Sequence, residues 1–149
     1  MNKLRVLISA TMLLVLMVPS LVSAQSREYI NPSSASEAGV SPFSGAVLTD
    51  GTLYLSGMIG LVDGQVPDSA AEEARVLLDQ VKATLEQAGM TMDDLVYVQI
   101  FCSDVAHYDA FNSVYRGYFT EEFPARAFVG VGTLLFDARF EIQSIAVKR

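Results

Sequence analysis

Residues 69–104, SAAEEARVLLDQVKATLEQAGMTMDDLVYVQIFCSD, carry the strongest structural signal in the chain. Asp68 or Ser69 can cap a helix here, and Glu72, three residues after Ser69, completes a capping-box pattern. Small and aliphatic residues then recur at intervals of three and four, on one helical face: Ala74, Leu77, Leu78, Val81, Leu85 and Ala88. Gly89 is a typical residue just after a helix end. This stretch therefore predicts a helix with one apolar face.

The same stretch continues into a predicted strand. Val96, Val98 and Ile100 occupy alternate positions after Asp94, the period of two that is typical of a strand with one buried face. Cys102, the only cysteine, follows in this apolar run. A single cysteine forms no intrachain disulfide, and its apolar neighbours favour a buried, unreactive thiol.

Weaker patterns on either side of this stretch complete the predicted fold. Asp50-Gly51 lies between two apolar runs, which is a strong hairpin signal. The other expected elements are an irregular arm over residues 25–43, a hairpin within residues 44–60, a second helix over residues 108–119, and strands over residues 125–134 and 138–147. This order predicts one α+β domain over residues 25–149, with two helices on one face of a mixed sheet.

The first 24 residues have the pattern of a cleaved secretory signal peptide. Lys3 and Arg5 provide a positive start, an apolar run extends from Val6 to Val18, and Val22 and Ala24 occupy the −3 and −1 positions. The apolar run is shorter than the roughly 20 residues that span a bilayer, which argues against a membrane anchor. We expect cleavage after Ala24 and a periplasmic or secreted mature chain that is not attached to the membrane.

The charge of the chain limits its partners. The chain has ten basic and 17 acidic side chains, which give a net charge of −7. Loss of Lys3 and Arg5 with the signal peptide changes the net charge to −9. Such a surface repels phosphate-rich partners, so neither nucleic acid nor an anionic membrane is expected to bind. An anionic substrate would need a local cation. His107 is the only histidine and no cysteine pair is present, so no metal site is expected.

One arginine stands out in the mostly apolar segment FPARAFVGV, residues 123–131. Strand alternation places Arg126 on one face with Phe128 and the glycines that follow at every second position. The alternation leaves two roles open for Arg126: a structural ion pair, for instance with Glu141 if the last two strands are neighbours, or a planar fork that binds a carboxylate.

Six segments together resemble the RidA/YjgF reactive-intermediate deaminase (Rid) family. They are SPFSGAV, LYLSGMIG, all of residues 71–104, FNSVYRGYF, FPARAFVGV and FEIQSIAVKR. The resemblance covers nearly all of residues 25–149 and lies in the order and spacing of the segments more than in any one motif. It implies a chorismate-mutase-like α+β domain, assembled as a homotrimer with ligand sites in the clefts between subunits.

The resemblance also implies an activity and its residues. Members hydrolyse imines and enamines, such as 2-aminoacrylate, to 2-keto acids and ammonia without a metal or organic cofactor. Arg126 matches the arginine that binds the substrate carboxylate, and Glu141 matches the glutamate that positions or activates water. Ser56-Gly57 corresponds to a wall of the cleft, and Asn112 to a polar residue beside it.

Two positions depart from the family pattern and keep a second function open. Phe43 stands where members often have a tyrosine, and Phe128 stands where they often have a cysteine. Each phenylalanine either fills apolar space or changes which ligands the pocket accepts. The expected function is an exported imine and enamine deaminase. The alternatives are a trimeric binding protein for small carboxylate metabolites without turnover and, more weakly, a surface-interaction or chaperone-like protein.

Overall fold

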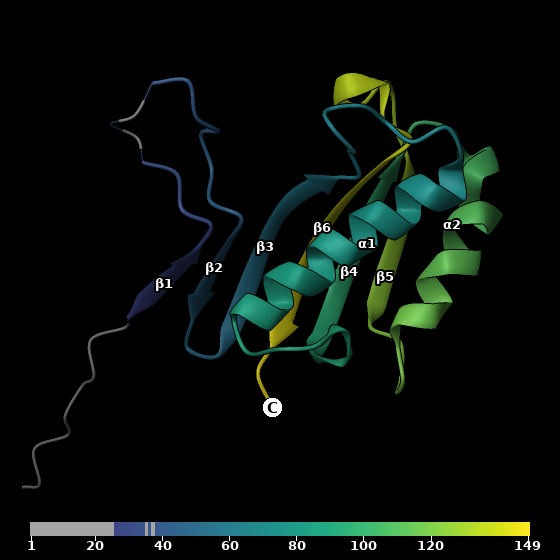
Figure 1. Ribbon diagram of the computed structural model, residues 1–149. Coiled ribbons are helices and arrows are strands. Elements are labelled where there is room, and N and C mark those ends of the chain that lie inside the picture. The colour runs from purple at the N-terminus through teal and green to yellow at the C-terminus, as the bar shows by residue number, and fades with distance from the viewer. Residues whose placement is uncertain (1–25, 35, 37) are drawn as a thin grey trace, which may run out of the picture.

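The computed structural model describes residues 26–34, 36 and 38–149 (Figure 1). The predicted signal peptide lies outside these residues. Within them the strands are β1 (Arg27–Ile30), β2 (Ala46–Thr49), β3 (Thr52–Ile59), β4 (Leu95–Cys102), β5 (Ala125–Gly130) and β6 (Phe140–Val147), and the α-helices are α1 (Ala70–Gln87) and α2 (Tyr108–Tyr115). None of the helices in this part of the chain is long and apolar enough to cross a membrane.

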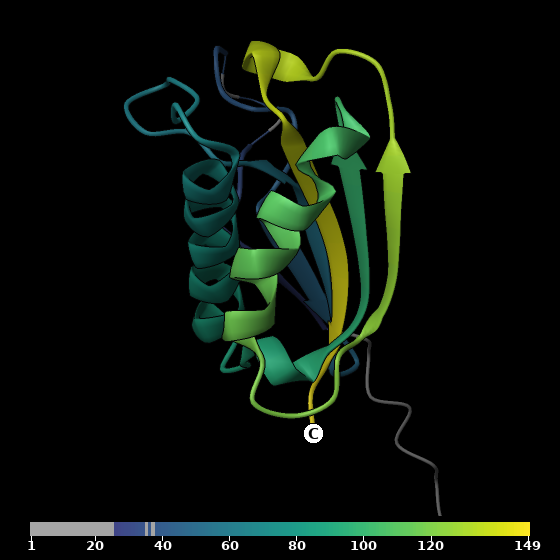
Figure 2. The same cartoon turned by 90° about the vertical axis from the view of Figure 1, so that its right-hand side faces the viewer.

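The six strands form one mixed sheet in the order β1-β2-β3-β6-β4-β5. All neighbouring strands run antiparallel except β4 and β5, which run parallel. Both helices cover the same face of this sheet, as the view along its edge shows (Figure 2). The predicted α+β fold with two helices on one face of a mixed sheet is therefore confirmed.

Helix α1 forms as its sequence pattern predicts. The Ser69 hydroxyl oxygen accepts a hydrogen bond from the Glu72 N–H at 3.2 Å, which caps the helix start. Its predicted apolar face is buried against the sheet, with Ala74, Leu77, Leu78, Val81 and Leu85 fully inaccessible. After the helix, the Gly89 N–H bonds to the Glu86 carbonyl with a φ of +69°, and the chain turns toward β4.

The N-terminal arm differs from its prediction, because part of it forms β1. The segment Arg27–Ile30 pairs antiparallel with β2, although only Ile30 of its four residues is buried. A strand at the exposed edge of a sheet is held by backbone hydrogen bonds, so its sequence needs no alternation of apolar residues. For this reason the polar and proline-rich sequence gave no sign of the strand.

The later elements are shorter than the sequence predicts, and one strand contains an irregularity. Helix α2 ends at Tyr115 in a 3-10 turn, and β5 ends at Gly130 rather than residue 134. In β4 the pairing with β6 shifts between Leu95 and Tyr97, which leaves Val96 46% exposed instead of buried. Cys102 is buried as predicted.

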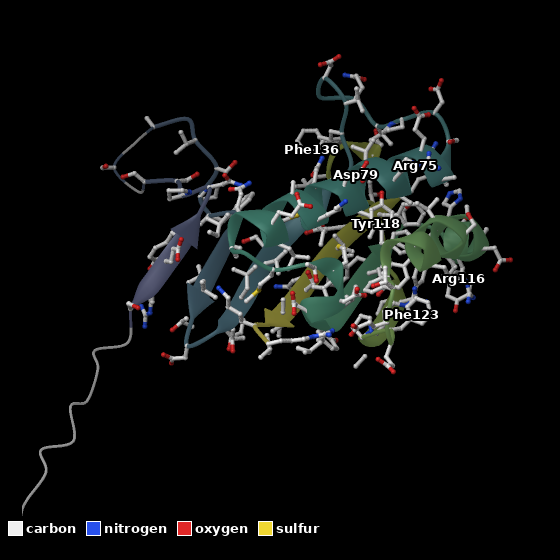
Figure 3. All side chains as sticks on the ribbon, turned by 60° about the horizontal axis from the view of Figure 1, so that its bottom comes forward. Arg75, Asp79, Arg116, Tyr118, Phe123 and Phe136 are labelled. Carbon is white, nitrogen blue, oxygen red and sulfur yellow. The ribbon has the colours of Figure 1, made fainter. Side chains whose placement is uncertain are left out.

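The two helices also contact each other through polar groups. The Tyr118 hydroxyl, just after α2, donates a hydrogen bond of 2.7 Å to the Asp79 carboxylate of α1. Figure 3 shows Tyr118 beside Asp79 and Arg75. Burial together with the adjacent Asp79 carboxylate raises the pKa of Tyr118 well above its usual value. This bond fixes the end of α2, on which Asn112 and Tyr115 lie, relative to α1.

Candidate functional site

Arg126 lies near the start of the edge strand β5 in a half-buried position under α2. Its Nη1 donates a hydrogen bond of 2.7 Å to Oδ1 of the buried Asn112. Its guanidinium carbon lies 4.8 Å from the centre of the Tyr115 ring. Among the described residues no carboxylate lies within salt-bridge distance of Arg126. The predicted ion pair of Arg126 is therefore wrong within the part of the chain that the structure describes. The Asn112 amide and the Tyr115 ring hold the guanidinium instead.

Phe128 packs on the same side of β5 as Arg126, but its ring points into the core. The ring lies edge-on to Tyr108 at 5.0 Å and to Phe111 at 5.7 Å, measured between ring centroids. It is partly buried against the main apolar cluster. Of the two roles predicted for Phe128, the structure therefore supports apolar filling. The centre of its ring lies 6.0 Å from the Arg126 guanidinium carbon.

Arg126 borders a small cavity, which we call the arginine site. It has a volume of about 210 Å³ and is lined by Tyr115, Arg116, Phe123, Pro124 and Arg126. The Tyr115 ring is buried, and its hydroxyl has no hydrogen-bond partner among the described residues. Burial raises the pKa of Tyr115 to about 12, although the Arg126 charge acts in the opposite direction. The phenol therefore stays neutral at ordinary pH.

Glu141 belongs to a different cavity, which we call the glutamate cavity. It has a volume of about 550 Å³, and Phe43, Ser56, Gly57 and Glu141 all line it. Ser56 and Gly57 lie where β3 has one residue more than β6 between two paired positions, a β-bulge that bends the strand. The Ser56 hydroxyl donates to the Ser44 carbonyl at 2.6 Å, so this bond fixes the start of the bulge.

Gly57 gives the Glu141 carboxylate its space. A Cβ atom at position 57 would overlap Oε1 of Glu141. Any residue with a side chain at this position would therefore displace the carboxylate. Phe43, 54% exposed, lies at this cavity and does not fill the core.

The arginine site and the glutamate cavity are separate within one chain. Strand β4 lies between β5 and β6, so the two last strands are not neighbours. Arg126 pairs with Val98, which is buried beneath the helices, whereas Glu141 pairs with Phe101. Positions 98 and 101 of one strand point to opposite faces, three residues or roughly 10 Å apart. The structure therefore brings Ser56, Gly57, Phe43 and Glu141 together, and Arg126, Asn112 and Phe128 together, but keeps the two groups apart.

Comparison with known proteins identifies the family of this chain. The profile of the family described as Endoribonuclease L-PSP matches residues 34–148. A Bos taurus protein named 2-iminobutanoate/2-iminopropanoate deaminase is 37% identical over 130 residues, which cover 85% of this chain and 94% of the relative. A crystal structure of the Rid-family protein YyfA from Yersinia pestis is 30% identical with a TM-score of 0.72, and covers 82% of this chain and 99% of its own. The chain belongs to the RidA/YjgF family.

Another RidA/YjgF structure contains a small ligand. Escherichia coli TdcF with bound serine superposes with a TM-score of 0.73 at 27% identity, and the match covers 82% of this chain and all of that one. The names of these relatives point to two chemistries, RNA cleavage in the family description and imine hydrolysis in the bovine deaminase. The resemblance found in the sequence segments is therefore confirmed at the level of the family.

Sequence reasoning missed one buried acid, Glu73, which lies at the start of the strand that carries Glu141. Glu73 of α1 is fully buried, and its carboxylate accepts hydrogen bonds from the N–H groups of Arg139 and Phe140 and from the Arg139 guanidinium. Arg139 also donates to the carbonyls of Pro67 and Asp68. This network holds the start of β6, one residue before Glu141. The only sign in the sequence was an acidic residue beside the apolar face of the helix.

The described residues contain no group of three or more His, Cys, Asp or Glu side chains placed to hold a metal ion. The groups available for chemistry at the two cavities are therefore a guanidinium, a carboxylate, a phenol and amide or backbone groups. Such groups can bind an anion, place a water molecule and transfer a proton.

Proposed function

We propose that this protein hydrolyses 2-imino and 2-enamino acids to 2-keto acids and ammonia. The observation that supports it most is Arg126, a half-buried guanidinium held by Asn112 and by the Tyr115 ring, with no carboxylate partner among the described residues. A planar cation in this state is suited to bind an incoming carboxylate with two parallel hydrogen bonds. The names of the RidA/YjgF relatives supply the reaction class.

The proposed reaction needs orientation and one placed water molecule. A 2-enamino acid first becomes the imino acid by transfer of one proton from its nitrogen to its β-carbon. Arg126 binds the carboxylate of the imino acid and so fixes the adjacent C=N carbon. Glu141 accepts a proton from water as its oxygen attacks this carbon. The carbon–nitrogen bond then breaks, the nitrogen leaves as ammonia with the protons supplied by water, and a 2-keto acid remains. No oxidant or reductant takes part.

We further propose that the complete site forms between two subunits of a homotrimer. Within one chain, Arg126 and Glu141 lie on opposite faces of the sheet with β4 between them. A three- or four-carbon imino acid is too short to contact both. Arg126 of one subunit beside Glu141 of the next would complete the site, and this agrees with the exposed position of β5 at the edge of the sheet.

The acidic surface favours this reaction over RNA cleavage. A net charge of −7, or −9 after loss of residues 1–24, repels a polyanion, whereas one arginine is enough to attract a single carboxylate. The chain also has one histidine only, so it lacks the pair of imidazoles that could serve as acid and base in RNA hydrolysis.

The proposed activity is tested by measuring ammonia and keto-acid release from imines that an amino-acid oxidase generates in the same solution. Arg126→Ala removes a bidentate, charge-assisted contact worth about 3 kcal/mol, so kcat/KM should fall roughly a hundredfold. Arg75→Ala, which removes an exposed arginine of α1, is the matched control and should retain full activity. Turnover that survives Arg126→Ala unchanged would refute the assigned role.

The alternative is a trimeric protein that binds small carboxylates without turnover. The serine bound in Escherichia coli TdcF is a small molecule with a carboxylate, so a relative binds a ligand of this size and with this group. Calorimetry with 2-keto acids separates the two functions. Arg126-dependent binding together with no acceleration of imine hydrolysis would support the binding protein.

We also propose that the protein is exported and cleaved after Ala24. The support is the positive start, apolar run and small residues at the cleavage site within residues 1–24. Fractionation of expressing cells and the N-terminal sequence of the purified protein test this proposal. A mature chain that still begins at Met1 and remains with the cytoplasm would contradict it.

A further inference from the structure

The glutamate cavity is lined mainly by apolar side chains. Besides Glu141 its polar side chains are Ser56, Gln80 and Gln143. The apolar ones are more numerous: Phe43, Met58, Ile59, Leu61, Leu135 and Phe136. A volume of about 550 Å³ with apolar walls and a few polar groups is typical of a site for a small organic molecule.

Two of these apolar side chains are unusually exposed. Leu135 and Phe136, in the turn before β6, are 70% and 65% exposed, more than any other large apolar side chain among the described residues. They lie next to each other in sequence and line the same cavity as Phe43. Single exposed apolar side chains are common on protein surfaces, whereas a cluster of them at a cavity marks a binding surface.

The backbone holds this pair in position. Phe136 has a φ of +60° and Asp137 a φ of +57°, a conformation that residues other than glycine rarely adopt. Such strain persists only where the surroundings fix the chain, and it is frequent at ligand sites. Here the buried Glu73 carboxylate binds the N–H groups of Arg139 and Phe140, just after the turn. Figure 3 shows Phe136 well apart from Arg116 and Phe123 of the arginine site.

The shape of an imino acid determines which part of it meets this surface. Its reacting carbon carries three groups: the carboxylate, the nitrogen and the side chain. If Arg126 of a neighbouring subunit binds the carboxylate and Glu141 faces the reacting carbon, the side chain extends along the wall of the glutamate cavity. The residues lining that cavity include no cation and one acid, so a negatively charged side chain would be repelled. Burial against apolar walls favours an apolar side chain instead.

We propose that the preferred substrates are 2-imino acids with large apolar side chains, aliphatic or aromatic, which bind against Phe43, Leu135 and Phe136. This inference rests on the proposed function. It gives that function a substrate class that differs from the small imines named for the bovine relative.

The test compares imines made by one amino-acid oxidase from alanine, leucine and phenylalanine, with semicarbazide to trap the imine that remains. We expect kcat/KM for the two larger imines to exceed that for the alanine imine by roughly tenfold or more. The double variant Leu135→Ser with Phe136→Asn should bring this ratio close to one. Asparagine tolerates the left-handed backbone at position 136, so the turn should keep its shape. Val105→Ser is the matched control, because Val105 is 59% exposed and lies outside the residues that line the cavity.

Each outcome separates this inference from the proposed function. Arg126-dependent turnover with a preference for the alanine imine would overturn the substrate class and leave the function standing. If no imine is hydrolysed, the proposed function fails, and calorimetry with phenylpyruvate and pyruvate decides the ligand class: tighter phenylpyruvate binding supports the apolar surface, and equal binding overturns it. If the double variant loses its assembled state in light scattering, the pair is a subunit contact and the inference is wrong.

Discussion

Replacing Glu73 by alanine is expected to lower the free energy of unfolding by about 3–5 kcal/mol, the usual cost of removing one partner of a buried ion pair. Glu73 is fully buried, and its Oε1 accepts from the N–H groups of Arg139 at 2.7 Å and Phe140 at 3.0 Å. Its Oε2 accepts from the Arg139 guanidinium at 2.8 Å. Alanine leaves both N–H groups without an acceptor, at about 1–3 kcal/mol each.

The Arg139 side chain reduces this cost in part. It is 27% exposed, and its guanidinium keeps the carbonyls of Pro67 and Asp68 as acceptors, so its charge is not left fully uncompensated. Glu73→Gln should fall between wild type and alanine. An amide oxygen can still accept from the two N–H groups, but the charge-assisted contact with Arg139, worth about 1.5–3 kcal/mol, is lost.

Urea unfolding followed by circular dichroism measures these differences, provided that all variants are compared at one protein concentration in case subunits associate. Glu72→Ala is the matched control, because Glu72 is the neighbouring but exposed glutamate of the same helical turn and should change the free energy by less than about 1 kcal/mol. If Glu73→Ala and Glu72→Ala have the same effect, the described network does not stabilise the fold.

Four other predictions concern single residues. Gly57→Ala should reduce imine hydrolysis roughly a hundredfold with little change in Tm, because the new Cβ displaces the Glu141 carboxylate; unchanged kinetics would contradict the close approach. Arg126→Lys keeps the charge but loses the planar fork, so KM should rise about tenfold, and an unaltered KM would exclude bidentate binding. Burial raises the pKa of the Cys102 thiol, so iodoacetamide at pH 8 should label it only after unfolding in urea, and rapid labelling of the folded protein would refute its buried position. Burial raises the pKa of Tyr115 from 10.0 to about 12, so its stabilising effect is complete below pH 10 and is lost as the pH rises toward 12. Tm should therefore drop between pH 10 and about 12, and by less in Tyr115→Phe.

Several elements of the fold are determined by short stretches of sequence alone. Helix α1 has its cap at Ser69, its apolar face and its end near Gly89 within 21 residues, and all three are confirmed. The turn at Asp50-Gly51 is likewise a local property, because both residues adopt positive φ values there. The identity of the site residues came from the order of the family segments, and Arg126 and Glu141 remain predictions until they are tested.

The relation between these residues was decided by the tertiary structure only. Strands pair through backbone hydrogen bonds, which do not depend on which side chains are present. For this reason the sequence did not indicate that β1 joins the sheet or that β4 separates β5 from β6. This strand order separates Arg126 from Glu141, and the pairing of Arg126 with Val98 and of Glu141 with Phe101 places the two side chains on opposite faces. In the same way, the role of Glu73 depends on a segment 66 residues further along the chain. The pattern of apolar residues in a helix specifies which face of the helix is buried. Which groups contact that face depends on segments that are distant in the sequence, so only the folded chain specifies them.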